Sequence, residues 1–392
     1  MKTRFSYLDH LECSLCQRPY EAGLLRNSSP CCGRPLLVQY NLAELARAIG
    51  PETFAGREAT LWRYHELLPV STAEAVVSLG EGMTPLLSMP RLAPAGLENQ
   101  ARLLIKDEGL NPTGSFKARG MAVAVARAVE LGVTGLVTPT AGNAGVAMAA
   151  YAARAGLPAY VSLPEDTPQT YIDQARRYGA EIELVRGLIS DAGQIAARVA
   201  QERGWFNVAT LKEPYRAEGK KTMGLELAEQ LSWRLPEVII YPAGGGTGIV
   251  GMWKAFQELR KLGWLRDQRL PRLIIVQAEG CAPLVRAFQA GLEESEPWPA
   301  DQARTRAMGL RVPSAIGDRL ILQAIRESGG TALTVSDASM EHMAEYAARR
   351  AGIWISLEAA ATLAAYHTLL ANQIVSLNNQ TVLFFTGSGW VG

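Results

Sequence analysis

The chain has 392 residues, of which 48% are apolar, and its 39 lysines and arginines nearly balance 38 acidic residues. This length predicts two domains of about 100–200 residues each. Balanced charge argues against nucleic acid or an anionic membrane surface as a main partner. We find no uncharged apolar run of about 18 residues, so we expect no membrane partner, and the start MKTRFSYLDHLEC lacks the apolar core of a signal peptide. We therefore expect a cytoplasmic protein.

The first 40 residues differ from the rest of the chain, because four of the five cysteines lie there: Cys13, Cys16, Cys31 and Cys32. Two cysteine pairs around a short polar loop are typical of a zinc ribbon, in which thiolates close a tetrahedral site. A ribbon usually repeats C-x-x-C, however, whereas the second pair here is adjacent. Structural zinc and a degenerate ribbon with free thiols both remain open. Either interpretation gives this segment a structural role, and so few cysteines do not indicate a disulfide scaffold.

Helical segments alternate with apolar strands from residue 117 onward. The strand-like runs are GLVTP, AYVSLP, EIELV, EVIIYP, RLIIVQAE and TVLFF. This alternation predicts an α/β fold with two doubly wound open sheets, each covered by helices on both faces. In such sheets the functional loops lie at the carboxyl ends of the strands. Residues 291–306 break the pattern, and we expect them to form a mobile surface segment.

Lys117 occupies a position that suits a reactive amine. The stretch NPTGSFKARG follows the apolar run Leu103, Leu104 and Ile105 and opens a periodic segment, MAVAVARAV. A helix N-terminus presents the positive end of its dipole. This neighbourhood and reduced solvation both lower the pKa of an amine and make it a better nucleophile toward a carbonyl. An ordinary surface lysine is the alternative interpretation.

Three further loops resemble the Lys117 loop in placing small or hydroxylic residues after a strand. They contain Asn143, the sequence AGGGTG at residues 243–248, and Thr386. The glycine-rich loop suits a phosphate, because its backbone N–H groups can converge without side chains in the way. It lacks the G-x-x-x-x-G-K-[ST] pattern of nucleoside-triphosphate loops. A tight turn is the alternative, although such a turn rarely needs three consecutive glycines.

A phosphate cup and a reactive lysine together indicate pyridoxal 5'-phosphate as the cofactor, because its aldehyde requires an amine and its phosphate requires a donor-rich cradle. With these loops, the chain resembles the fold-type-II pyridoxal-phosphate enzymes of the tryptophan-synthase-β-like group. Within that group it is most similar to the threonine synthases. The resemblance extends over SLGEGMTPLL, the lysine loop, PTAGNAG, EPYRAEGKKTM, PAGGGTG and the final TGSG.

The resemblance implies a role for each of these positions. Lys117 would form the Schiff base with the cofactor and move protons on the substrate, Asn143 would bind the ring hydroxyl, and Thr386 would face the ring nitrogen. The phosphate of the cofactor would be held by Gly244, Gly245, Gly246, Thr247 and Gly248. Substrate-binding residues would be Thr140, Ala141, Gly142 and Ala144 for the carboxylate, Arg216, Lys220 and Lys221 for a second anion, and Glu358 near the ring. The alternatives are a helix cap for Asn143 and a strand-end turn for Thr386. For Arg216, Lys220 and Lys221 the alternative is an ordinary solvated basic stretch, and for Glu358 it is a helix N-terminal charge.

The implied activity is that of a carbon–oxygen lyase which converts O-phosphohomoserine and water to threonine and phosphate. Three departures from the family pattern put the substrate in question: Ala118, the run Leu357–Glu358–Ala359, and the end Trp390–Val391–Gly392. The alternatives are a threonine or serine ammonia-lyase and a β-replacement enzyme that uses O-phosphoserine. A non-catalytic binding protein is disfavoured, because the lysine, the asparagine and the glycine cup are all present.

The domain organisation follows the same resemblance. Residues 1–40 would form the ribbon-like segment, residues 41–117 and 213–392 the large cofactor-binding domain, and residues 118–212 a small mobile α/β domain. The active site would lie between these two domains and close on the substrate. We expect a homodimer acting on a small amino-acid substrate.

Overall fold

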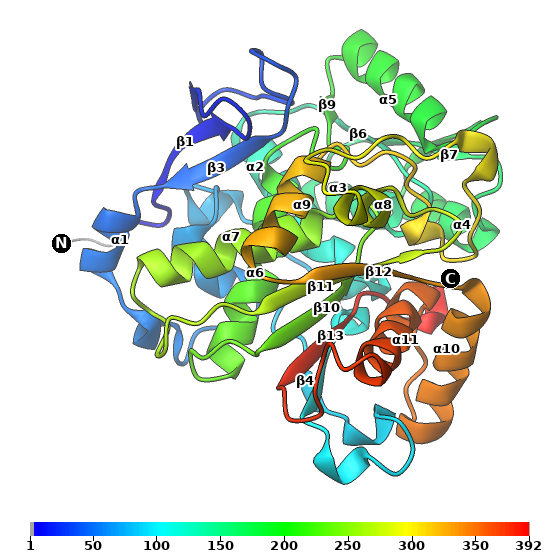
Figure 1. Ribbon diagram of the computed structural model, residues 1–392. Coiled ribbons are helices and arrows are strands. Elements are labelled where there is room, and N and C mark those ends of the chain that lie inside the picture. Colours follow the sequence, from blue (N-terminus) through cyan, green and yellow to red (C-terminus); the bar gives the residue numbers. More distant parts are fainter. Residues whose placement is uncertain (1–3, 392) are drawn as a thin grey trace.

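Three β-sheets organise the structure, a computed structural model that describes residues 4–391 (Figure 1). The largest sheet has six strands in the order β12-β11-β10-β13-β5-β4. Its neighbouring strands are parallel except for β4, which runs antiparallel to β5. The strands are β4 (Leu86–Ser88), β5 (Leu103–Asp107), β10 (Val238–Pro242), β11 (Arg272–Ala278), β12 (Thr331–Val335) and β13 (Thr381–Phe385).

Helices cover both faces of this sheet, as the near-continuous apolar strands predict. Because side chains alternate along a strand, Ile239 and Tyr241 of β10 pack on one face, whereas Val238 and Ile240 pack on the other. The first face carries α6 (Tyr215–Gln230), α7 (Thr247–Lys261), α8 (Pro283–Gln289) and α9 (Asp318–Glu327). The second face carries α10 (Asp337–Ala351) and α11 (Leu357–Ala371), at the lower right of Figure 1.

The second sheet is parallel throughout and has four strands in the order β8-β7-β6-β9. These are β6 (Leu136–Pro139), β7 (Ala159–Pro164), β8 (Glu181–Val185) and β9 (Phe206–Asn207). Leu136 faces a core shared with α2 (Lys117–Glu130) and α3 (Asn143–Ala155), whereas Val137 faces α5 (Ile189–Arg203). Helix α4 (Gln169–Arg177) lies between β7 and β8 in the chain. The sequence therefore predicts both open sheets correctly.

The N-terminal segment forms a small antiparallel sheet, in the order β2-β1-β3, beside the two larger sheets. Its strands are β1 (Leu8–Cys13), β2 (Pro19–Glu21) and β3 (Leu36–Tyr40), and helix α1 (Leu42–Ala48) follows. The segment is tied to the body of the protein at its polar groups. Tyr40 donates a 2.7 Å hydrogen bond to Glu218 of α6, and Arg127 of α2 donates one to the carbonyl of Ala22.

Candidate active site

A cavity of about 580 Å³ lies where the carboxyl ends of both open sheets meet. Pro139, the last residue of β6, forms one wall. Another is formed by Pro242, the last residue of β10, and Thr386, which follows β13. This is where ligands bind in open α/β sheets, because the loops that follow parallel strands converge at one edge. The loops of Lys117, Asn143, Gly244 and Thr386 all reach this cavity.

Lys117 is the first residue of α2 and lines the cavity. A short turn precedes it in which Thr113 adopts a φ of 62°, the left-handed region, so that the chain reverses just before the helix. The Lys117 amine lies 3.9 Å from the centre of the Phe116 ring. Burial, aided by the charge of Arg216 and opposed by Glu358, lowers the pKa of Lys117 to about 7. A large fraction of this amine is therefore uncharged at neutral pH and able to attack a carbonyl.

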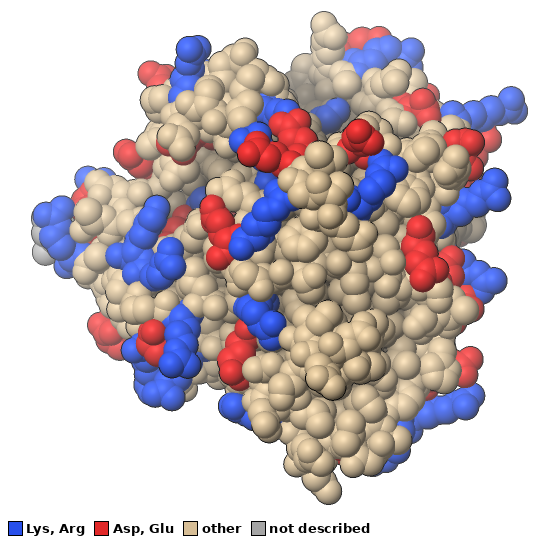
Figure 2. All heavy atoms as spheres, viewed as in Figure 1, with Lys and Arg blue, Asp and Glu red and all other residues tan. Residues whose placement is uncertain are grey.

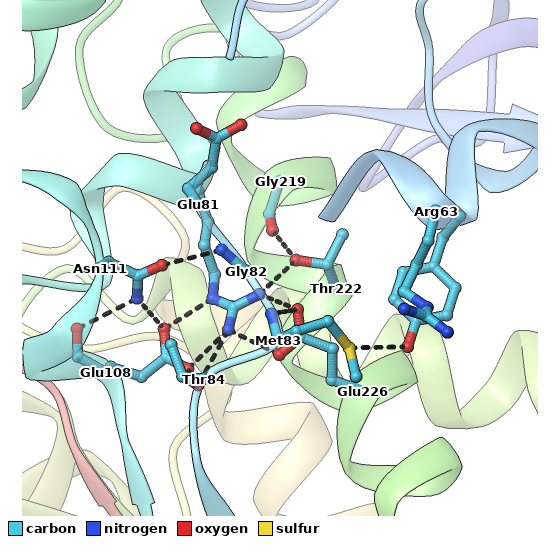
Figure 3. A network of polar contacts seen from close by, with 12 residues as sticks. Arg63, Glu81, Gly82, Met83, Thr84, Glu108, Asn111, Gly219, Thr222 and Glu226 are labelled. Atoms are coloured by element: carbon cyan, nitrogen blue, oxygen red, sulfur yellow. Dashed lines mark hydrogen bonds and ion pairs between the residues drawn. The ribbon is translucent and has the colours of Figure 1, made fainter. Parts of the chain in front are cut away.

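A buried network of charges fixes the start of α2. Arg119, two residues after Lys117, donates to Glu108 at 2.6 and 2.8 Å and to Glu226 at 2.7 Å. Lys106 donates to the same Glu226 at 2.9 Å. Figure 3 shows Glu108 and Glu226 converging in this network, from the residues after β5 and from α6. The network therefore ties the lysine loop to the six-stranded sheet and to α6 without exposing any charge.

The glycine-rich loop connects β10 to the N-terminus of α7 and leaves no room for side chains. A Cβ atom on Gly244 would lie 2.1 Å from the carbonyl oxygen of Gly309. Gly246 has a φ of 68° and holds the position before the helix. Gly244, Gly245, Gly246 and Thr247 line the cavity, so that the positive end of the α7 dipole opens onto it. Gly248 lies outside this wall, where its missing side chain makes space for the hydroxyl of Tyr241.

Asn143 is the first residue of α3 and lines the cavity. Its Oδ1 is buried without a hydrogen-bond partner among residues 4–391, and its amide lies 3.5 Å from the Tyr171 hydroxyl. Gly142, with a φ of 154°, holds the cap position, and the Asn143 side chain makes no capping bond. The capping alternative for Asn143 is therefore not realised. Thr140 shapes the loop by accepting a 3.1 Å hydrogen bond from the Gly142 N–H.

Thr386 and Glu358 complete the wall contributed by the six-stranded sheet, and both line the cavity. The Thr386 carbonyl accepts a 3.0 Å hydrogen bond from the Phe116 N–H, which joins the last loop directly to the lysine loop. Glu358, in the first turn of α11, accepts a 2.7 Å hydrogen bond from the Gly309 N–H. The Glu358 carboxylate is therefore held in place by the segment that covers the glycine loop.

The three basic residues of EPYRAEGKK have different surroundings. Arg216 and Lys220 line the cavity and are 2% and 1% exposed. Lys221 points away from the cavity and forms ion pairs with Glu218 at 2.6 Å and Glu258 at 3.0 Å. Because helix neighbours at consecutive positions point about 100° apart, one lysine faces the cavity and the next faces α7. The expected anion contact from Lys221 is thus not available in this arrangement.

The sequence analysis missed several parts of the wall. Tyr171 of α4 packs against Gly142, and burial raises its pKa to about 12. Trp298 belongs to the segment expected at the surface, yet it lines the cavity together with residues 308–316. No local pattern marks these residues, because they reach the site only through tertiary contacts. The clue available in the sequence was the tryptophan between two prolines in EPWPAD.

These residues fit pyridoxal phosphate. The glycine loop is a cradle that a Cβ would fill, Asn143 holds an unpartnered acceptor, and Lys117 supplies a deprotonatable amine. All three features face one cavity. Together they would hold the phosphate, the ring hydroxyl and the aldehyde of the cofactor.

The four N-terminal cysteines gather at one point. Their sulfur atoms all lie within 4.8 Å of one another, and no disulfide links them. Hydrogen bonds from Ser29, Tyr20 and Cys16 lower the pKa of Cys31 to about 6. A cluster of four thiols, one already prone to ionise, could hold a metal ion such as Zn²⁺. The cluster lies in the small antiparallel sheet and contributes nothing to the cavity wall.

Charged side chains of both signs are spread over the face in view. Figure 2 shows acidic and basic side chains interspersed over this face, with no broad patch of one sign. Across residues 4–391, the structure contains no helix that is both long and apolar enough to cross a membrane.

Comparison with known proteins places this site in a family. Residues 77–387 match the family described as "Pyridoxal-phosphate dependent enzyme". This match spans most of the chain and includes all four loops of the cavity. The chain therefore belongs to the pyridoxal-phosphate-dependent enzymes of fold type II.

In sequence, the chain is similar over most of its length to proteins named threonine synthase. The protein from Methanocaldococcus jannaschii is 35% identical over 360 residues, which cover 91% of this chain and 87% of that protein. The one from Methanosarcina acetivorans is 33% identical over 380 residues, covering 96% and 91%.

Among solved structures, a threonine deaminase from T.th. superposes with a TM-score of 0.62 at 28% identity, covering 77% of this chain and 93% of its own. Maize serine racemase superposes with a TM-score of 0.66 at 22% identity, covering 78% and 88%, and that likeness concerns the fold alone.

Proposed function

We propose that this protein is a threonine synthase, which converts O-phosphohomoserine and water into threonine and phosphate by γ-elimination and addition of water at the β carbon. The observation that carries the proposal is the meeting of Lys117 with two buried basic residues, Arg216 and Lys220, in one cavity. An amino acid that bears a phosphate needs both a reactive amine and a second anion site. The two archaeal relatives named threonine synthase support the same choice.

Pyridoxal phosphate supplies an aldehyde for the substrate amine and an electron sink for a carbanion at the α carbon. Lys117 would hold that aldehyde through its Nζ, and the same atom would accept and return protons at the carbon atoms of the substrate. The pKa of Lys117, about 7, suits both the acceptance and the return of a proton. Asn143 would accept a hydrogen bond from the ring hydroxyl through its unpartnered Oδ1. Thr386, which lines the same cavity, would lie near the ring nitrogen, where a neutral hydroxyl would favour elimination over transamination.

Substrate anions have separate positions in this proposal. The N-terminus of α3, with Thr140, Ala141, Gly142 and Ala144, binds the α-carboxylate. Arg216 and Lys220 bind the phosphate that leaves from the γ carbon. Among the described residues that line the cavity, Glu358 is the one with a carboxylate. Its charge favours the protonated form of Lys117. Closure of residues 118–212 over the bound substrate excludes water until the β-addition step.

We further propose that the four cysteines bind one structural Zn²⁺, and that the enzyme is a cytoplasmic homodimer. A zinc ion would close the small sheet, which is too small to build a core of its own. The thiol cluster and its distances support the zinc site.

The test of the activity is the absorbance spectrum of the purified protein before and after addition of O-phosphohomoserine, with released phosphate and threonine assayed in the same sample. A visible cofactor band with stoichiometric threonine and phosphate supports the proposal. A band without phosphate release rejects it and directs the assay to threonine, serine and O-phosphoserine. Formation of 2-oxobutanoate from threonine alone would identify an ammonia-lyase instead, the reaction suggested by the name of the threonine deaminase neighbour.

A further inference from the structure

Lys220 is a second amine in the cavity, distinct from the reactive lysine. It projects from α6 toward the start of α2, where its Nζ donates a 2.6 Å hydrogen bond to the carbonyl of Phe116. Its amine also lies 4.3 Å from the centre of the Phe116 ring. A Cβ on Gly120 would lie 2.9 Å from this Nζ, so the glycine leaves the space that the amine occupies. Lys220 is therefore held at a defined place in the wall, 1% exposed.

Neither Lys220 nor Arg216 forms an ion pair with a carboxylate of residues 4–391. Arg216 donates from Nη1 to the Val208 carbonyl at 2.7 Å, and its buried Nε has no partner among the same residues. The adjacent Lys221 shows the contrast, because it is paired with two glutamates. Burying an unpaired cation is costly, so a buried base is either neutral or awaits an anion.

Arg216 and Lys220 respond differently to burial without a counter-ion. A guanidinium stays protonated in proteins, whereas an ammonium can lose its proton. Burial, with the charges of Lys117 and Arg216, lowers the pKa of Lys220 far below its ordinary value. The charged and titratable groups around Lys220 are Lys117 and Arg119 on α2, Arg216 and the nearby Glu213 at the start of α6, Glu108 after β5, Tyr241 on β10 and, across the cavity, Glu358. Burial without a carboxylate partner, together with these cationic neighbours, therefore favours the neutral amine until an anion binds.

We propose that Lys220 is the proton-accepting half of the anion site beside Arg216, so that a phosphate monoester dianion binds there together with one proton taken up by the Lys220 amine. The proposal deepens the proposed function, on which it rests for the identity of the phosphate-bearing substrate. The balance is simple: the neutral amine, one proton from solvent and the dianion become an ammonium paired with the phosphate. No covalent bond between heavy atoms forms or breaks in this step. The site would thereby distinguish a dianion from a monoanion, because only the dianion repays the proton uptake.

The experiment is titration calorimetry of the holoenzyme with ethyl phosphate, in buffers that differ in ionisation enthalpy. Ethyl phosphate has no amino group that could react with the cofactor, and the phosphate site of the glycine loop is already filled in the holoenzyme. At about pH 8 the ester is a dianion, since its second pKa is near 6. We expect uptake of about one proton per ester bound, and much weaker binding of ethyl sulfate, the monoanion of similar shape.

Variants separate Lys220 from other groups that could take up the proton. Lys220→Arg should bind ethyl phosphate but take up no proton, because its charge is permanent. Lys220→Gln should weaken binding by about tenfold or more through loss of a charge-assisted hydrogen bond. Lys212→Gln, which removes an exposed lysine from the rim of the same cavity, should keep the uptake of the wild type. Glu213→Gln tests whether Glu213 takes up the proton in place of Lys220, because burial raises the pKa of Glu213 to about 7.

The measurements on the wild type test the proposal even if one variant fails to fold. Binding of ethyl phosphate to the wild type without proton uptake overturns the proposal, as does uptake that persists in Lys220→Arg or disappears in Glu213→Gln alone. Absence of binding by the wild type overturns the anion site itself. Proton-linked binding in an enzyme that does not turn over O-phosphohomoserine would leave this inference standing, reject the threonine synthase proposal and point to another phosphate-bearing amino acid.

Discussion

Arg311, a residue of the cavity wall, forms an ion pair with Asp166, with 2.7 Å between Nη2 of the arginine and a carboxylate oxygen of the aspartate. Arg311 lines the cavity in the segment that covers the glycine loop, and Asp166 follows β7 of the four-stranded sheet. The pair therefore joins a segment of the cavity wall to the loop that follows β7 of the four-stranded sheet. Since the Asp166 side chain is 54% exposed, its contribution to folding should be small, about 0–1 kcal/mol.

Asp166→Asn should raise the KM for substrate by about threefold or more, because closure of the cavity loses a link between its walls. The unfolding temperature should fall by less than about 4 °C, the shift expected for at most 1 kcal/mol. Glu165→Gln is the matched control, since this adjacent carboxylate forms, among residues 4–391, a single ion pair, with exposed Arg186 at 3.6 Å. Equal KM values for Asp166→Asn and Glu165→Gln would show that the Arg311–Asp166 pair has no role in closure of the cavity.

Attachment of pyridoxal phosphate to the apoenzyme should accelerate as pH rises and level off above about pH 7. The amine must be uncharged to react, and the pKa of Lys117 is lowered to about 7 by burial and Arg216. Glu358 opposes this shift, so Glu358→Gln should move the profile to lower pH. The measurement is the rate of borohydride-fixed attachment, located by peptide mass, with Lys117→Ala as the blank. A rate that keeps rising toward pH 10 would mean an ordinary, solvated lysine.

Glu226→Gln should lower the free energy of unfolding by about 3–5 kcal/mol, because Arg119 and Lys106 lose a buried counter-ion. Glu181→Gln breaks an exposed pair with Arg203 and should cost about 1 kcal/mol or less. Urea denaturation of both variants makes the comparison. Similar losses of unfolding free energy in the two variants would show that the buried network stabilises the protein no more than an exposed ion pair does.

The same glutamate should make stability depend on acid. Burial opposes its charge, but Arg119 and Lys106 lower the pKa of Glu226 to about 2 from an ordinary value of 4.5. A depressed pKa adds stability above the unfolded value, and this stability is lost as pH falls through the folded value. The difference between wild type and Glu226→Gln should therefore be full near neutral pH and shrink between pH 4.5 and about 2. A difference that is independent of pH would contradict this account.

Gly244→Ala should weaken the binding of pyridoxal phosphate by about tenfold or more, the effect of losing one good phosphate contact. The new Cβ would lie 2.1 Å from a backbone oxygen, so the loop itself must move. Gly193→Ala is the control, because this glycine lines the same cavity and a Cβ there meets nothing within 4 Å. Fluorescence titration of apoenzyme with cofactor measures both. Unchanged affinity in Gly244→Ala would place the phosphate elsewhere.

Purified protein should contain about one zinc ion per chain, since four thiolates complete a tetrahedral site. Cys13→Ser combined with Cys32→Ser should abolish the metal and lower the unfolding temperature, while the cofactor spectrum stays unchanged. Cys281→Ala removes the fifth cysteine, which lies outside the cluster, and should leave the metal content unaltered. Metal-free wild-type protein with four titratable thiols would favour the degenerate ribbon.

The class of fold and the four loops could be predicted from local sequence alone. Near-continuous apolar strands such as VIIYP specify parallel sheets buried on both faces, and a run such as AGGGTG specifies a loop whose backbone must approach a ligand or another segment closely. Lys117 could be located because the helix start and the small residues before it adjoin in the chain. These features depend on neighbours within a few residues, and local physics determines them.

The sequence by itself determined the sheets, the lysine loop and the glycine loop, whereas only the tertiary structure decided which charges face the cavity. Lys220 and Lys221 are adjacent and chemically alike, yet one meets Phe116 and the other meets Glu218 and Glu258. Tyr171 and Trp298 likewise reach the wall from distant segments. The physical reason is that the direction of a helical side chain depends on how the whole helix packs, and α6 is oriented by contacts with α2 and α7 that no local pattern encodes.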